Sequence, residues 1–303
     1  MRKFFEMMYF SPKWYHYIMM VLLLPLSFLY ASIMLLRRLF TSKKSFNIPI
    51  VSVGNLIVGG AGKTPFVMAL ASRYDGVTVI SRGYGRKSQG LLQVSAKGKI
   101  LTSVHTSGDE AMLIAKSLPN ASVIVSENRE IAIELAMREG AKLIILDDGF
   151  NRVEIKKFEI VLEPQRILNY FPFPSGPFRE FPLMKCYADI VVKEGSDFHR
   201  MVEFENLSKK MLLVTAISHP QRLDTYLPEG VVGKVYLEDH AYFNEEYLLQ
   251  EMQEYGALSL LVTQKDAVKM ETFKLPLSFM KLKLEIDDTI VSSIDDYVSA
   301  FYK

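Results

Sequence analysis

The residues whose chemistry is easiest to interpret form a glycine-rich loop. A β-branched run that includes Val53 precedes it, and an apolar helical pattern begins at Phe66 just after it. The candidate nucleotide-binding residues of the loop are Gly59, Gly60, Ala61, Gly62, Lys63 and Thr64. In such a loop, backbone N–H groups and the positive end of the following helix bind phosphate oxygens. The lysine then reaches the β- and γ-phosphates of a nucleotide, and the threonine hydroxyl can ligate Mg²⁺.

The loop departs from the standard phosphate-binding pattern at one position. That pattern has a glycine five residues before Gly62, where this chain has Ile57, and the nearest upstream glycine is Gly54. The alternative interpretation is a plain glycine-rich turn between a strand and a helix. Because Gly-Lys-Thr lies between a predicted strand and a predicted helix, the pattern favours a nucleoside triphosphate site.

A second chemical signal is a pair of carboxylates after an apolar run. Residues 143–146 are apolar, and Asp147 and Asp148 follow them directly. Such a strand delivers a carboxylate to Mg²⁺ in proteins that transfer phosphate. Adjacent carboxylates also repel each other unless a cation lies near them. The pair, together with Thr64, therefore predicts a magnesium site, the alternative being an ordinary polar strand terminus.

Three further residues are candidates for catalysis or phosphate binding. Asp109 begins a helical pattern, as either a helix cap or a general base that accepts a hydroxyl proton, and the residue pattern alone favours the cap. His240 follows Asp239 after a predicted strand, and a neighbouring carboxylate can set its charge and orientation. Arg129 begins another helical pattern, as either a phosphate ligand or a surface residue.

Two more loops carry charged residues. The loop after the predicted strand at 77–80 contains Arg82 and Arg86 among glycines, which suits either an anionic group near the backbone or a solvated basic turn. The segment at 263–266 faintly resembles a base-reading loop, but its spacing favours a capped helix start.

The first 40 residues carry much of the chain's excess hydrophobicity. No Lys, Arg, Asp or Glu occurs from Trp14 to Leu36, a length sufficient to cross a hydrocarbon core of about 30 Å. Basic residues follow at 37–44, which favours a membrane anchor with a cytoplasmic body. Pro25 leaves open whether the helix spans the bilayer or enters one leaflet. The alternatives are a buried core helix and a cleaved signal peptide, although no small-x-small site precedes the basic cluster.

The remaining chain alternates short β-branched runs with helical patterns. Strands are expected at 48–53, 77–80, 122–125, 142–146, 159–162, 189–192, 211–215, 231–235, 258–262 and 281–285. Helices are expected at 63–73, 109–117, 128–139, 245–255 and 291–301. This alternation predicts an α/β fold with a mostly parallel sheet, in which ligands bind beyond the carboxyl ends of the strands.

Composition excludes some functions. A net charge of +2 over 303 residues gives no indication of a nucleic-acid partner. The single cysteine, Cys186, excludes an internal disulfide and a cysteine-based zinc site.

In order and spacing, these motifs resemble the tetraacyldisaccharide 4′-kinase family of lipid A biosynthesis. The matching segments are 53–55, 58–65, 81–86, 108–110, 147–150, 175–180, 239–240 and 263–269, and the apolar N-terminal helix also belongs to the family pattern. The resemblance implies that the γ-phosphate of ATP is transferred to the 4′-hydroxyl of a tetraacyl glucosamine disaccharide 1-phosphate, which forms lipid IVA. It places this reaction at the cytoplasmic face of the bacterial inner membrane, among its lipids.

The resemblance also implies a domain organisation. It predicts an N-terminal membrane helix and basic linker at 1–45, a P-loop NTPase-like kinase domain with a parallel sheet at 46–182, and a second, smaller α/β domain at 183–303. The two α/β domains would be joined by a hinge, with ATP in the first.

The family's site residues can be carried over by motif. The family's base falls on Asp109 and its histidine partner on His240, which overturns the preference for Asp109 as a cap alone. The resemblance implies that Lys63 and the loop amides bind the β- and γ-phosphates. It implies that Thr64, Asp147 and Asp148 hold Mg²⁺, and that Arg129 stabilises phosphate charge. We add Arg82 and Arg86 as candidates for the anionic end of the substrate.

Two other functions fit parts of this pattern. A membrane-tethered P-loop switch ATPase shares the glycine loop, but such proteins usually carry a further lysine near its start, where this chain has Val58 before Gly59. A non-enzymatic anchored scaffold leaves the Gly-Lys-Thr and Asp-Asp motifs unexplained.

Overall fold

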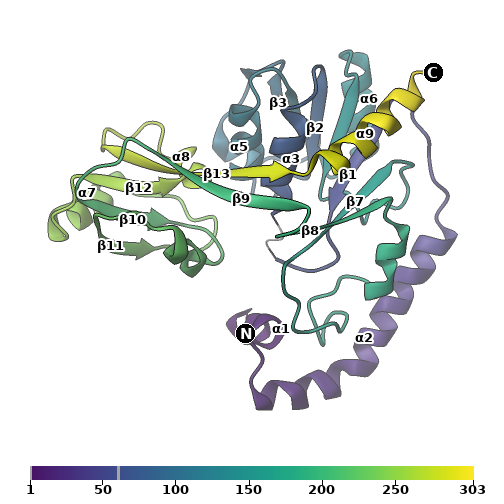
Figure 1. The fold of residues 1–303 in the computed structure, drawn as a ribbon, viewed down its shortest axis with the longest axis horizontal. Coiled ribbons are helices and arrows are strands. Elements are labelled where there is room, and N and C mark those ends of the chain that lie inside the picture. Colours follow the sequence, from purple (N-terminus) through teal and green to yellow (C-terminus); the bar gives the residue numbers. More distant parts are fainter. Residues whose placement is uncertain (1, 60–61) are drawn as a thin grey trace. The chain divides into compact units, whose positions relative to one another are not determined.

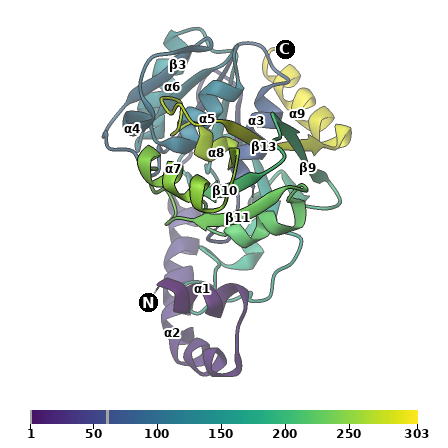
Figure 2. The ribbon, with the colours of Figure 1, turned by 90° about the vertical axis from the view of Figure 1, so that its left-hand side faces the viewer.

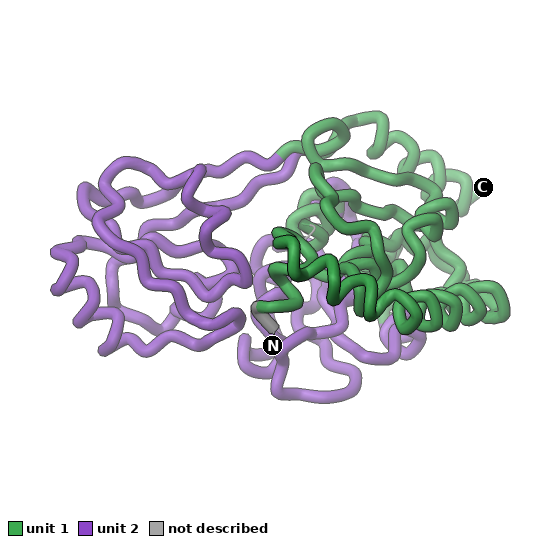
Figure 3. Tube along the Cα trace, turned by 90° about the horizontal axis from the view of Figure 1, so that it is seen from below, with its two compact units in different colours: residues 1–70, 136–199, 286–303 green, residues 71–135, 200–285 purple. Residues whose placement is uncertain are grey.

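The computed structural model describes residues 2–59 and 62–303, which form an α/β protein with a helical N-terminus (Figure 1). The chain folds into two compact units, coloured separately in Figure 3. Unit 1 comprises Met1–Leu70, Ala136–His199 and Ile286–Lys303, and unit 2 comprises Ala71–Leu135 and Arg200–Glu285. The division into domains at 1–45, 46–182 and 183–303 remains a prediction.

The strands of unit 1 are parallel and follow the order β6-β1-β7-β8. They are β1 (Ile50–Gly54), β6 (Leu143–Asp147), β7 (Phe158–Glu163) and β8 (Ile190–Lys193). Helices α3 (Lys63–Ala71), η1 (Pro182–Tyr187) and α9 (Asp288–Phe301) complete this part. Every residue of β1 and β6 is buried, and Val53 pairs with Asp147 in the sheet register. The glycine loop and the acidic pair therefore leave the sheet at the same edge.

Unit 1 also contains the two N-terminal helices, α1 (Arg2–Phe10) and α2 (Trp14–Phe40). Helix α2 is continuous through Pro25 and bends along its course (Figure 1). Its start lies beside α1 (Figure 2), and the two helices pack through a cluster of Met8, Tyr9 and Met20. Within the described part of the chain, α2 is the one helix long and apolar enough to cross a membrane.

The first part of unit 2 contains four strands in the order β4-β3-β5-β2. They are β2 (Val77–Ser81), β3 (Leu92–Ala96), β4 (Lys99–Ile100) and β5 (Ser122–Val125), accompanied by helices α4 (Val104–Ser107), α5 (Asp109–Ser117) and α6 (Arg129–Arg138). Strands β2 and β5 are parallel, whereas β3 is antiparallel to β4 and β5.

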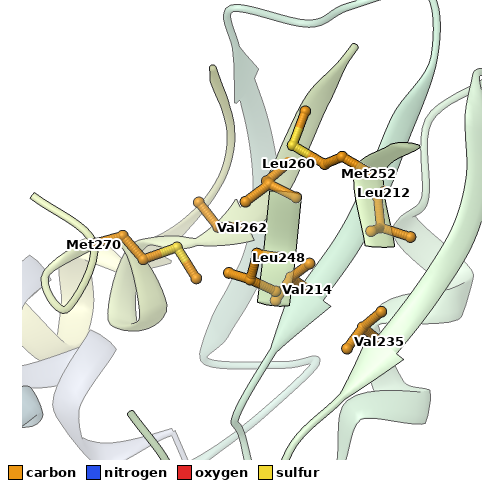
Figure 4. Packing of buried hydrophobic residues seen from close by; sticks show 8 residues of the cluster. All are labelled: Leu212, Val214, Val235, Leu248, Met252, Leu260, Val262 and Met270. Carbon is orange, nitrogen blue, oxygen red and sulfur yellow. The ribbon is translucent and has the colours of Figure 1, made fainter. Parts of the chain in front are cut away.

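The second part of unit 2 is a five-stranded sheet in the order β11-β10-β12-β13-β9. Its elements are β9 (Phe198–Glu205), β10 (Met211–Thr215), η2 (Pro220–Tyr226), β11 (Val231–Tyr236), α7 (Glu245–Glu254), β12 (Ser259–Thr263), α8 (Gln264–Ala267) and β13 (Leu277–Ile286). A core cluster joins the sheet to α7 through Leu248 and Met252, which lie among side chains of β10, β11 and β12 (Figure 4). Burial of such branched aliphatic side chains supplies most of the favourable free energy of folding.

All strands and helices expected from the sequence are present, with ends that shift by a few residues. The mostly parallel α/β arrangement is confirmed. The elements that were not expected are α1, α4, η1, η2, β3, β4 and β9.

Candidate active site

The glycine loop lies between β1 and α3, as predicted. Gly59 and Gly62 have φ values of +99° and +77°, a conformation that glycine adopts without steric strain. Lys63 is the first residue of α3, so the loop ends at a helix N-terminus, where phosphate is favoured. The predicted ligands Gly60 and Ala61 lie outside the described residues.

The unusual start of the loop has a structural explanation in Asn55. Its side-chain amide donates to the Ile57 carbonyl at 2.8 Å, and its side-chain oxygen accepts a hydrogen bond from Lys63 Nζ at 2.9 Å. Gly54 is required just before it, because a Cβ there would lie 2.5 Å from the Phe150 Cβ. Asn55 thus links the beginning of the loop to its lysine, a role that the sequence analysis did not assign.

The acidic pair lies at the end of β6. Asp147 is buried as the last residue of the strand, and Asp148 follows with a left-handed φ of +55°. Both carboxylate oxygens of Asp148 lie 3.1 Å from Arg179 Nη1, and one lies 3.5 Å from Lys63 Nζ. Burial alone would raise the pKa of Asp148, but the charges of Lys63 and Arg179 hold it below its usual range. Asp148 is therefore an ionised carboxylate beside the P-loop lysine.

The oxygen donors at this edge suit Mg²⁺, which uses one or two carboxylates together with substrate phosphates and water. Asp147 and Asp148 at the end of β6 could supply the carboxylates, and Thr64 in the first turn of α3 could supply a hydroxyl, but their role as metal ligands remains a prediction. Across residues 2–59 and 62–303, no group of three or more His, Cys, Asp and Glu side chains forms a metal cluster. A bound Mg²⁺ would take its remaining ligands from nucleotide phosphates and water.

The second candidate catalytic centre is Asp109 of unit 2. Gly108 occupies the N-cap position of α5, and Asp109 is the first helical residue, so the interpretation of Asp109 as the cap is wrong. Its carboxylate lies 2.9 Å from His240 Nδ1 and 3.0 Å from Lys269 Nζ. Lys265 Nζ is 3.9 Å away. The structure therefore brings together the predicted Asp109–His240 pair and adds two lysines to it.

The charge of Asp109 is fixed by these partners. The side chain is 4% exposed, and burial alone would raise its pKa. The hydrogen bond from His240 and the charges of Lys265 and Lys269 outweigh burial, so the pKa of Asp109 lies well below its usual range. An ionised carboxylate accepts hydrogen bonds only, which makes Nδ1 of His240 the protonated nitrogen.

His240 is held by its backbone as well as by Asp109. It has a left-handed φ of +63°, and its N–H donates to the Ala216 carbonyl at 3.0 Å. The Tyr84 ring lies 5.3 Å from the imidazole ring, centroid to centroid. From the sequence, the adjacent carboxylate of Asp239 was expected to set the charge and orientation of His240. The Asp239 carboxylate lies 3.7 Å from Nε2, whereas the Asp109 carboxylate is closer, at 2.9 Å from Nδ1.

Asp266 stabilises the backbone around the Asp109 centre. It is fully buried and accepts hydrogen bonds from Thr215 Oγ1 at 2.6 Å, Thr263 Oγ1 at 2.7 Å and the Ala216 N–H at 3.1 Å. Thr263 in turn caps α8, which confirms the predicted capped helix start. Burial raises the pKa of Asp266 in spite of these hydrogen bonds. Asp266 thus joins the loop after β10, which holds His240, to the helix that precedes Lys269.

Replacing Asp266 by Ala will lower the free energy of unfolding by about 3 kcal/mol, because three buried donors lose their acceptor. Urea unfolding followed by circular dichroism measures this change. Asp296→Ala on exposed α9 is the matched control and should change stability by less than about 0.5 kcal/mol. Equal stability of the two variants would contradict the role given to Asp266.

The sequence analysis missed the lysines of the Asp109 centre. Lys269 is 1% exposed and also donates to the Ala241 carbonyl at 3.1 Å, and Lys265 pairs with Glu110 at 3.2 Å. Their spacing of four residues was the one feature of the sequence that could have linked them, because residues four apart lie on one face of a helical turn.

The three candidate arginines have different surroundings. Arg82 is exposed. Arg86 has a buried side chain that pairs with the Glu127 carboxylate. Arg129 is buried and donates to the Ser126 carbonyl. Their proposed roles in binding anions remain predictions.

A loop that ends in Gly-Lys-Thr between a parallel strand and a helix, beside a strand that ends in two aspartates, defines a P-loop nucleotide-binding protein. Comparison with known proteins makes the assignment specific. The family model described as tetraacyldisaccharide-1-P 4′-kinase matches residues 19–206 and 198–299. The chain belongs to the tetraacyldisaccharide 4′-kinase family.

Individual relatives agree with this assignment. The chain is 46% identical to a tetraacyldisaccharide 4′-kinase from Helicobacter acinonychis, over 99% of this chain and 96% of that protein. It is 44% identical to one from Aliarcobacter butzleri, over 96% of each. The fold is similar to that of a crystal structure described as the "apo" form of LpxK from Aquifex aeolicus in complex with ATP. The TM-score is 0.78 with 27% identity, covering 92% of this chain and 99% of that one.

Proposed function

We propose that this protein transfers the γ-phosphate of ATP to the 4′-hydroxyl of a tetraacyldisaccharide 1-phosphate, a step of lipid A biosynthesis. The observation that carries the proposal is the P-loop lysine, held between Asn55 and Asp148, in a chain whose whole length matches kinases with this activity. The ATP complex of the similar LpxK structure supports ATP as the donor.

The P-loop half of the reaction follows from its charges. Lys63 and the loop amides bind the β- and γ-phosphates, and the helix N-terminus of α3 adds positive potential. Mg²⁺, held by Thr64, Asp147 and Asp148, would neutralise the negative charge that the phosphates carry. Lys63 already lies against Asp148, so a bound nucleotide meets a lysine that is held in place.

Asp109 is the group that accepts the proton of the 4′-hydroxyl. The oxygen of that hydroxyl forms the new bond to the γ-phosphorus, while the bond from that phosphorus to the β,γ-bridging oxygen breaks. In a loose phosphoryl-transfer transition state the attacking hydroxyl has formed little of its new bond, so its proton acceptor need not be a strong base. A carboxylate with a lowered pKa can therefore orient the hydroxyl and accept its proton late in the reaction. His240 and Lys269 keep this carboxylate ionised and fix its orientation.

The arginines complete the proposed binding site. Arg129 stabilises phosphate charge, and Arg82 and Arg86 bind the anionic end of the substrate. Arg82 is the more accessible of these two, since Arg86 holds Glu127 and the Gly90 carbonyl.

Helix α2 suits a place in the membrane surface rather than across the bilayer. One face is exposed and apolar, with Ile18, Leu22 and Leu29 among its residues. The opposite face is buried in unit 1, where Ser27 Oγ bonds to Ser175 Oγ at 2.8 Å and Arg38 pairs with Glu180. A spanning helix would take these body contacts into hydrocarbon, where loop backbone is not tolerated. We therefore place α2 in one leaflet of the inner membrane, with the body in the cytoplasm.

This placement explains the choice of partners. The acyl chains of the acceptor stay in lipid, and an enzyme held at the same surface meets them at a raised effective concentration. The exposed basic residues Arg37, Lys43 and Lys44 favour anionic membrane lipids. Nucleic acid is not among the proposed partners, since the net charge is only +2.

Replacing both Leu22 and Leu29 by Glu will release the protein from vesicles of anionic phospholipid, by about tenfold or more in the partition coefficient. Vesicle flotation measures the bound fraction. Leu249→Glu is the matched control, because Leu249 is an exposed leucine of α7 and its change should leave binding intact. Unchanged flotation of the Leu22/Leu29 double variant would contradict the interfacial role of α2.

The decisive test of the activity is transfer of labelled γ-phosphate from Mg²⁺–ATP to a tetraacyl disaccharide 1-phosphate in detergent micelles. Label in the lipid supports the kinase. Label released only as inorganic phosphate, with or without acceptor, would instead indicate the membrane-tethered switch ATPase.

A further inference from the structure

The membrane helix makes a buried ion pair close to the phosphate site. Arg38 lies near the C-terminal end of α2, with a side chain only 4% exposed, and Glu180, its partner, is 7% exposed. The pair is bidentate, since Nε and Nη2 of Arg38 each donate to a different Glu180 oxygen at 2.9 Å. Arg38 also donates to the Phe150 carbonyl at 3.2 Å and stacks over the Phe150 ring at 4.3 Å.

Both partners of Arg38 belong to segments that carry phosphate-site residues. Glu180 follows Arg179, whose guanidinium holds both oxygens of Asp148. Phe150 is two residues after Asp148 in the chain. One guanidinium therefore fixes the segment that contains Asp148 and the segment that contains its cationic partner.

The segment before Glu180 also reaches the glycine loop. The Val58 N–H donates to the Pro177 carbonyl at 2.8 Å, and the Arg179 N–H donates to the Leu56 carbonyl at 2.7 Å. Residues 177–179 thus run beside the stretch that leads into Gly59. Movement of Glu180 would therefore displace the start of the glycine loop as well as Asp148.

Asp148 needs such support because of its backbone. Its φ of +55° is a left-handed conformation that costs a non-glycine residue about 1 kcal/mol or more, and it persists only when the surroundings enforce it. Phe150 packs against Gly54, so the turn at 148–150 is fixed on one side by β1 and on the other by Arg38.

We propose that Arg38 is a positioning residue, which couples the membrane helix to the magnesium–nucleotide site by holding Asp148 through Phe150, Glu180 and Arg179. This inference rests on the proposed function for the role of Asp148. A buried ion pair is weak evidence for stability by itself, because desolvation offsets most of its attraction. The planar fork of arginine supplies three hydrogen bonds to two segments, which a single ammonium cannot reproduce.

The test compares Arg38→Lys with Arg37→Lys. Arg37 is the adjacent residue and has the same charge, but its side chain is 43% exposed and pairs with Glu154 at 3.4 Å. We expect Arg38→Lys to raise the Mg²⁺ concentration that gives half-maximal tightening of ATP binding by about tenfold or more, as loss of outer-shell support commonly does. ATP binding in EDTA should change less than about threefold, since Lys63 and the loop remain. Arg37→Lys should leave both values unchanged.

A readout without metal or nucleotide makes the test independent of catalysis. Hydrogen exchange of the peptide that covers residues 147–152 should be about tenfold faster in Arg38→Lys and unchanged in Arg37→Lys. If Arg38→Lys fails to fold, Glu180→Asp serves as the second variant. It shortens the carboxylate side chain of the ion pair, and the expected result is the same. Exchange and Mg²⁺ dependence that match the wild-type protein would overturn the positioning role. Failure of the wild-type protein to phosphorylate the lipid would overturn the proposed function and leave the exchange result standing.

Discussion

Replacing Asp109 by Asn will lower kcat by about 10³-fold and leave the affinity for ATP within about threefold of the wild-type value, a loss typical of a missing general base. The amide keeps the size of the side chain but cannot take the proton of the acceptor hydroxyl. It also leaves Lys269 with no anion at 3.0 Å, so the orientation of the centre is lost together with its basicity. Steady-state kinetics with the tetraacyl acceptor and equilibrium binding of ATP measure the two effects.

The neighbouring residue provides the control for Asp109. Glu110→Gln removes the next carboxylate of α5, which pairs with Lys265 at 3.2 Å and is not placed in the reaction. It should retain kcat within about threefold, because the Asp109 carboxylate keeps its contacts with His240 Nδ1 at 2.9 Å and Lys269 Nζ at 3.0 Å. Full activity of Asp109→Asn would show that another group accepts the proton, with His240 the first candidate because its Nδ1 lies 2.9 Å from Asp109.

Replacing Lys63 by Met will reduce both ATP affinity and kcat, with kcat/KM falling by about 10³-fold, since a cation aimed at developing phosphate charge is lost. This pattern differs from that of Asp109→Asn, in which binding is spared. Binding of a fluorescent ATP analogue and turnover of the lipid measure the two quantities.

The variant of Lys63 also frees Asn55 and Asp148 from their shared partner, so a folding control is needed. Lys185→Met is suitable, because Lys185 is an exposed lysine of unit 1 that pairs with Glu163. It should change neither quantity. A Lys63→Met protein that binds ATP as tightly as Lys185→Met would contradict the P-loop assignment.

The sequence predicted the central strands well because they are buried on both faces. Runs such as 143–146 and 211–214 are continuously apolar, and every residue of β10 is buried. Strand β9 was missed because its residues after Phe198 alternate between exposed and partly buried positions and include several charged side chains. Helix α4 was missed because it has only four residues, too few for a hydrophobic period to show, whereas α8, equally short, was indicated by its cap at Thr263.

The main residues of the candidate site were predicted from motifs, but several side chains that contact them were not. Lys63, Asp147 and Asp109 stand in patterns whose chemistry is local along the chain. Asn55, Arg179 and Lys269 act through pairings with residues up to 160 positions apart, such as Lys269 with Asp109. No spacing rule in one sequence reports such pairings, because the fold alone creates them. The preference for Asp109 as a helix cap failed by one residue, since Gly108 occupies the N-cap, and the contacts of Asp109 with residues 240–269 could not be seen in the sequence.

The N-terminal helices also contact the phosphate loop directly. Phe10 of α1 packs against Gly59, and Val58 joins the cluster formed by Met8, Tyr9 and Met20. Cutting the chain after Phe40 would therefore not produce a smaller, water-soluble version of the enzyme. It would strip the glycine loop of the apolar surface on which it rests, so the two helices are part of the structural support of the nucleotide site.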